Sequence, residues 1–130
     1  MPGRYHAVVW IDHRQARIFH FSADDADKIV VHAERPIREY RRGEKQAGRP
    51  LAEDQRFLEE VTEAVADAEA ILVVGPSDDK HEFVKHIQRV HPNMMVKVEG
   101  VEAAEQPGEG ELVAHARRFA KAAGRKRPQT

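Results

Sequence analysis

The stretch ILVVGPSDDKHEF, residues 71–83, contains a turn of a kind that often holds a phosphate in α/β folds. An apolar run stops at a Gly-Pro pair, and a polar segment that starts a helix follows. Such turns bind anions because backbone N–H groups and the positive helix end face the ligand. Here Asp78 and Asp79 occupy the first helical turn, complement its positive end and would repel a phosphate. With no Walker A or dinucleotide-binding glycine motif in the chain, we predict a plain strand-to-helix turn, capped by Ser77.

Apolar periodicity on either side of this turn predicts strands and helices in a fixed order. Two strands joined by a short turn open the chain, and a third follows an Asp-rich turn. Met94, Val96 and Val98 are expected on one face of the last strand, and Gly124 is expected to end the last helix. The predicted strands are 5–12, 16–21, 28–34, 70–74 and 94–99, and the predicted helices are 51–68, 78–91 and 111–123.

This order, β-β-β-α-β-α-β-α, predicts an α/β fold with a mixed five-stranded sheet and helices on its faces. It is the element order of the ribonuclease H-like architecture. We expect a single domain over residues 1–124 and a basic flexible tail over residues 125–130. Residues 35–50, RPIREYRRGEKQAGRP, have no sustained periodicity, which predicts a long basic loop between the third strand and the first helix.

A net charge of -1 conceals an uneven distribution of charge. The 35–50 loop carries six basic residues, and residues 117–127 carry six more with no acid, whereas 53–69 and 99–111 are acidic. Two basic patches indicate contact with a polyanion, and Tyr40 among arginines suits stacking on an unpaired base. The predicted RNA-binding residues are Arg35, Arg38, Tyr40, Arg41, Arg42, Lys45, Arg49, Arg125, Lys126 and Arg127.

Two segments carry a resemblance to a known family. ILVVGPSDDKHEFVKHI, after an acidic helix, resembles part of the central domain of archaeal and eukaryotic class 1 peptide-chain release factors and of Pelota. AVVWIDHRQARIFHF resembles that domain's opening hairpin, and the likeness extends over about residues 5–123. The chain looks closest to small bacterial members of that superfamily, often described as translational machinery proteins. The resemblance implies a ribonuclease H-like fold and a ribosome- or RNA-associated role in translation.

In the release factors, a loop at the matching place carries Gly-Gly-Gln and helps hydrolyse peptidyl-tRNA. The loop here contains Gly43, Gln46 and Gly48, but Gln46 follows Lys45 and the paired glycines are missing. Peptidyl-tRNA hydrolysis is therefore not expected, and no catalytic residue is assigned. What the resemblance leaves is a non-catalytic protein that binds RNA or the ribosome through this loop, as in Pelota-like relatives without the triplet.

Two alternatives remain open. Asp12 and Asp78, with Asp79 and Glu59 or Glu60, could form a two-metal nuclease site, although Asp12 and the Asp pair have local roles in their turns. Acidic and basic stretches on two copies could also pair in a homodimer.

Other classes of site find little support in the sequence. Eight histidines show no metal-binding spacing, although His6, His20 and His32 lie on neighbouring strands. We therefore assign no metal ligand and no cofactor. The chain has no cysteine, which fits a reducing cytoplasm, and no apolar run of the roughly 20 residues needed to cross a membrane.

Overall fold

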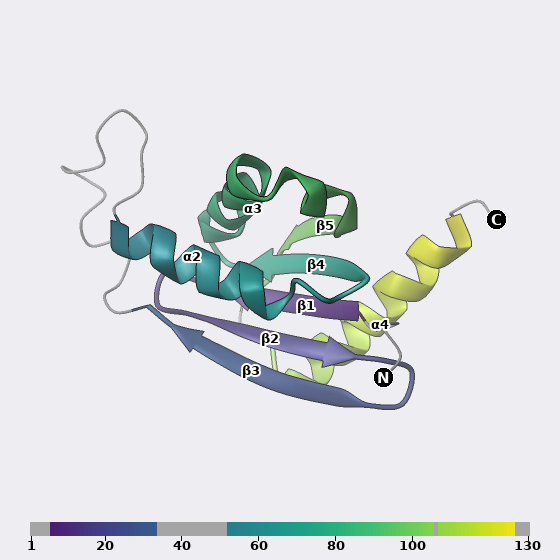
Figure 1. Cartoon of the computed structure of the whole chain (residues 1–130). Helices are drawn as coiled ribbons and strands as arrows, with labels where there is room; N and C mark the ends of the chain where they lie inside the picture. Colours follow the sequence, from purple (N-terminus) through teal and green to yellow (C-terminus); the bar gives the residue numbers. More distant parts are fainter. Residues whose placement is uncertain (1–5, 34–51, 106, 127–130) are drawn as a thin grey trace.

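The computed structural model describes residues 6–33, 52–105 and 107–126, with the backbone alone for residues 52–54 and 123–126 (Figure 1). The predicted 35–50 loop, Tyr5 and Arg127 lie outside the described residues. The strands are β1 (His6–Ile11), β2 (Gln15–Phe21), β3 (Ala26–His32), β4 (Ala70–Gly75) and β5 (Val98–Ala103). The helices are α2 (Ala52–Ala64), α3 (Asp79–Val90) and α4 (Glu109–Lys126), with a 3-10 segment η3 (Pro92–Lys97).

The strands form one five-stranded sheet in the order β3-β2-β1-β4-β5. The meander β1-β2-β3 is antiparallel, whereas β4 pairs in parallel with β1 on one side and with β5 on the other. β1 and β4 are buried along almost their whole length because helices cover both faces of the sheet at its centre. The predicted mixed α/β sheet is confirmed.

Alternate residues of the central strands point into two apolar cores. One face packs against α2 and α3, through Val9, Ile71, Leu58 and Phe83 among others. The other face packs against α4, with Trp10 as its largest fully buried side chain. Figure 1 shows this arrangement, with α2 and α3 on one side of the sheet and α4 on the other.

The last strand differs from its prediction. Residues 92–97 form η3, and β5 begins only at Val98, so that Val96 is 83% exposed instead of facing the core. Pro92 occupies the start of the 3-10 segment, where its fixed φ suits a helical turn. β5 then runs through Gly100, where an added Cβ would lie 2.7 Å from Phe119 Cζ, because α4 packs closely there.

Several helix ends also differ from their predictions, and α2 ends at Ala64 instead of residue 68. The residue that caps α3 is Asp78, in a helical conformation and without a side-chain cap bond. Ser77 instead donates from Oγ to Asp79 Oδ2 at 2.8 Å, and its carbonyl accepts from Lys80 Nζ at 2.6 Å. At the other end of the chain, α4 continues past Gly124 to Lys126, since one interior glycine costs a helix only about 1 kcal/mol.

Candidate functional site

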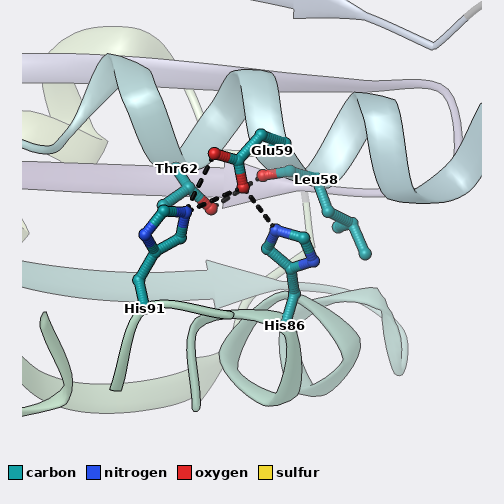
Figure 2. Close-up of polar contacts among 5 residues, drawn as sticks. All are labelled: Leu58, Glu59, Thr62, His86 and His91. Atoms are coloured by element: carbon teal, nitrogen blue, oxygen red, sulfur yellow. Dashed lines mark hydrogen bonds and ion pairs between the residues drawn. The ribbon is translucent and has the colours of Figure 1, made fainter. Parts of the chain in front are cut away.

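Glu59 forms the centre of a cluster with two histidines, where α2 packs against α3 (Figure 2). His86 Nε2 lies 2.8 Å from Glu59 Oε1. His91 Nε2 lies 2.9 Å from each of the two carboxylate oxygens. The His86 side chain is 4% exposed, whereas those of Glu59 and His91 are 31% and 35% exposed. The cluster is thus shielded from solvent at His86 and partly open to solvent at Glu59 and His91.

The local sequence explains how these side chains meet. Glu59 follows the buried Leu58 in α2, at the border of the apolar stripe that faces α3. His86 lies beside Ile87 on the buried face of α3. His91 follows the last residue of α3, and its N–H donates to the Ile87 carbonyl at 2.7 Å. That bond keeps His91 at the end of the α3 hydrogen-bond ladder, where its imidazole reaches the Glu59 carboxylate.

Thr62 lies one turn after Glu59 in α2 and is buried next to the cluster. Its hydroxyl donates to the Leu58 carbonyl at 2.8 Å, within the same helix. The hydroxyl proton is therefore used locally, and the polar contacts of the cluster run between Glu59 and the two imidazoles (Figure 2).

Two opposing effects set the pKa of Glu59. Partial burial raises it, but hydrogen bonds and charge interactions with His86 and His91 outweigh burial and leave the pKa below its ordinary value. The carboxylate is therefore ionised at neutral pH. Among the described residues, this is the only group of three His, Cys, Asp or Glu side chains with ligand atoms close enough to share a metal ion.

Three acidic residues of the nuclease alternative, Asp12, Asp79 and Glu59, have other partners. Asp12 Oδ1 accepts from the backbone N–H groups of Arg14 at 2.8 Å and Gln15 at 3.0 Å, and so holds the β1–β2 turn. Asp79 is buried and accepts from Ser77. Within the described ranges, neither Asp12 nor Asp78 belongs to a group with metal-ligand spacing, and Glu59 faces histidines instead.

The predicted RNA-binding residues fall mostly outside the described part of the chain. Arg35 to Arg49 and Arg127 lie outside the described residues, and Arg125 and Lys126 are described only as backbone at the end of α4. Their flanks are described. β3 ends at His32, paired with Gln15, at the edge of the sheet where β1 also ends. Ala33, the last described residue before position 34, lies beside the Asp12 turn, where its N–H donates to the Arg14 carbonyl at 2.9 Å.

The remaining histidines act singly. His6 stacks on Phe21 with ring centroids 5.7 Å apart, and His20 Nε2 lies 2.7 Å from the Ala64 carbonyl oxygen. His32 pairs in register with Gln15, so the three strand histidines do not meet across the sheet. His115 pairs with Glu102 at 2.7 Å. His6 and His20 are half-buried and His32 is exposed.

Sequence reasoning missed the Glu59 cluster. Glu59 appears in the sequence pattern only as a possible nuclease ligand, and the spacing of the histidines predicts no metal site at His86 and His91. One signal was available, because His86 lies on the apolar stripe of α3, where a polar residue needs a partner from the opposing helix.

Comparisons with solved structures show the fold. Pelota from Archaeoglobus fulgidus superposes with a TM-score of 0.61 at 15% identity, over 88% of this chain and 31% of that chain. The archaeal translation termination factor aRF1 gives 0.58 at 18%, over 88% and 34%. Dom34 from S. cerevisiae gives 0.55 at 8%, over 85% and 31%.

The chain thus spans about a third of the length of these proteins and shares their ribonuclease H-like domain fold. The resemblance inferred from the sequence is confirmed at the level of fold. No family model and no curated protein sequence matches the chain. Among the described residues, no helix is both long and apolar enough to cross a membrane.

Proposed function

We propose that the chain is a non-catalytic factor in translation that associates with RNA or the ribosome through its basic 35–50 segment. The observation that carries this proposal is the shared fold over more than four-fifths of the chain. One of the matching proteins is described as a translation termination factor, and Dom34 as a translation termination-like factor involved in RNA quality control. A fold alone does not fix a function, so the charge pattern has to supply the second part of the argument.

The 35–50 segment has the composition of a polyanion-binding arm. Its six basic residues face only two acids, Glu39 and Glu44. In the chain the segment lies between β3, which ends at His32, and α2, which begins at Ala52. Arginine and lysine neutralise phosphates without reading sequence, which suits a ribosomal target.

Absence of the Gly-Gly-Gln triplet from the sequence supports a binding role instead of hydrolysis. Lys45 precedes Gln46, where a release factor would need glycine for a close backbone approach. Of the acidic residues in the nuclease alternative, Asp12 and Asp79 are held in turns and Glu59 is paired with histidine. Of the two functions, binding is the better supported.

The test compares ribosome and RNA binding of two charge-matched variants. The first replaces Arg38, Arg41, Arg42 and Lys45 with serine. The control replaces four exposed basic residues outside both basic stretches with serine: Lys28, Arg56, Lys85 and Arg89. Both variants lose four positive charges, so a difference between them reports position and not net charge.

We expect the wild-type protein to co-sediment with ribosomes and its affinity to fall steeply with salt. The loop variant should lose about 0.7–0.9 of the log–log salt slope for each phosphate contact removed, whereas the control should keep most of it. If the loop variant and the wild-type protein had equal affinity and equal salt slope, the 35–50 segment would be ruled out as the binding site. Failure of the wild-type protein to bind ribosomes or RNA at low salt would end the proposal as a whole.

A further inference from the structure

We infer that Glu59, His86 and His91 bind a single divalent transition-metal ion, with zinc the best match to the ligand set. The inference is independent of the proposed function, because none of the three residues belongs to the 35–50 segment. It rests on the chemistry of the three groups, on their convergence and on the way the fold holds them.

The ligand set is typical of zinc. Two imidazole nitrogens and one carboxylate oxygen match the borderline softness of Zn²⁺, whereas Mg²⁺ and Ca²⁺ prefer oxygen ligands alone. Three protein ligands leave a fourth tetrahedral position for water or another small ligand. The exposure of the cluster agrees with that arrangement, because Glu59 and His91 are about one-third open to solvent and His86 is closed off.

The three groups already converge to within a short distance of metal geometry. One ligand atom from each residue lies within 4.8 Å of the others. Tetrahedral zinc with bonds of about 2.0–2.1 Å holds its ligand atoms roughly 3.3 Å apart. The His86 and His91 nitrogens lie 2.8 and 2.9 Å from Glu59 Oε1, so these two separations would each widen by about half an ångström around the ion. The ion would then replace the protons that the imidazoles share with the carboxylate.

The fold holds the ligands in place from three segments. Glu59 is fixed on α2, His86 on the buried face of α3, and His91 at the junction of α3 and η3. His86 turns its Nε2 towards Glu59, and within the described residues its buried Nδ1 has no hydrogen-bond partner. Its only polar contact is therefore with the cluster.

The bare Nδ1 also limits the affinity that we expect. A histidine bound to zinc usually donates its other ring N–H to an acceptor, and loss of such a partner weakens metal binding by about 10–100-fold. We therefore expect binding in the micromolar range, weaker than that of closed structural zinc sites. The competing interpretation is a plain hydrogen-bonded triad in which Glu59 joins the two helices without any ion.

Metal titration of the tag-free full chain distinguishes the two interpretations. Zn²⁺ binding would be measured by calorimetry after EDTA treatment and dialysis, and Co²⁺ binding by its visible absorption, which is intense only in tetrahedral sites. The test variants are Glu59→Gln, which keeps the shape of the side chain, and His91→Gln at the exposed side. The matched control is His115→Gln, which breaks the separate His115–Glu102 pair on α4 and β5.

We expect one ion per chain and loss of at least about 10-fold in affinity in each test variant, with no change in the control. Zinc at 100 times its Kd should raise the Tm of the wild-type protein by roughly 10 °C. Circular dichroism checks that the variants fold, and a variant that does not fold is replaced by the other. Absence of 1:1 binding, or equal affinity in Glu59→Gln, His91→Gln and the wild type, would overturn the inference and leave the hydrogen-bonded triad.

Discussion

Gly75 lies so close to Ile11 that a Cβ added to the glycine would meet the Ile11 carbonyl oxygen at 2.3 Å. The two residues end the neighbouring parallel strands β4 and β1. The Gly75 carbonyl in turn accepts a hydrogen bond from the N–H of Ala104, after β5, at 2.9 Å. The glycine of the Gly-Pro turn is therefore required where three strands end together, which explains it without any bound phosphate.

Gly75→Ala should destabilise the fold. The clash is with backbone, which a side-chain rotation cannot relieve, so we expect a loss of about 1–3 kcal/mol or more in the free energy of unfolding. Urea denaturation followed by tryptophan fluorescence measures it. A loss of less than about 0.5 kcal/mol, as at an ordinary surface position, would contradict the packing described here.

Gly110→Ala is the matched control and should have the opposite effect. Gly110 lies in the first turn of α4, and an added Cβ would meet nothing within 4 Å. Alanine stabilises a helix relative to glycine by up to about 1 kcal/mol, so the Tm should rise slightly. A fall in Tm would show that glycine is needed at that position for another reason.

Trp10 ties β1 to the segment that follows β5. Its Nε1 donates to the Glu105 carbonyl at 2.6 Å, and the Arg17 guanidinium lies 4.7 Å from the ring centroid. Trp10→Phe removes the indole N–H and leaves the Glu105 carbonyl without this hydrogen-bond donor, which should cost about 1–3 kcal/mol in the free energy of unfolding. Denaturation monitored by far-UV circular dichroism measures this cost. An unchanged stability would mean that the bond contributes nothing in solution.

The sequence was sufficient to predict the central sheet. The apolar runs in β1 and β4 have no polar face, and only strands covered by helices on both sides bury such runs. The short turn at Asp12 and the following apolar alternation then specify an antiparallel hairpin. Local patterns therefore determine the order of the strands, because each connection admits few alternatives.

β5 begins at Val98 instead of residue 94 because two local sequence signals were misleading. Met94, Val96 and Val98 alternate in the sequence as the apolar residues of a strand do. Pro92 nevertheless starts a 3-10 segment, in which the Met94 N–H donates to the His91 carbonyl. Gly100 is typical of a loop, but it lies within β5, where its lack of a side chain leaves room for the Phe119 ring of α4. The second cause is a tertiary contact, which a local pattern does not contain.

The Glu59 cluster depends on contacts across the chain. Glu59 is 27 residues from His86 and 32 from His91, and no spacing rule joins them. Only the packing of α2 against α3 brings the carboxylate to the imidazoles. A periodicity argument places each residue on its own helix but does not give the rotation of one helix against the other.

Substitutions at Val96 and Val101 test the observed position of β5. Val96 is 83% exposed, so Val96→Ser should change the free energy of unfolding by less than about 0.5 kcal/mol. Val101 packs against the core on the α2–α3 face, so Val101→Ser should cost about 1–3 kcal/mol. The predicted strand at 94–99 would reverse this order, which thermal denaturation of the two variants would reveal.

Asp12 distinguishes a structural turn from a nuclease site. Its Oδ1 accepts two backbone N–H groups, and an amide oxygen can replace it in both bonds. Asp12→Ala should therefore lose about 1–2 kcal/mol in the free energy of unfolding, since each net hydrogen bond contributes about 0.5–1.5 kcal/mol, and Asp12→Asn should recover most of it.

A metal-binding carboxylate would behave differently, because asparagine lacks the charge that holds Mg²⁺. Cleavage of labelled RNA with Mg²⁺ or Mn²⁺ completes the comparison. Metal-dependent cleavage by the wild-type protein that disappears in Asp12→Asn would make the chain a nuclease and reverse the assignment of Asp12 to the turn.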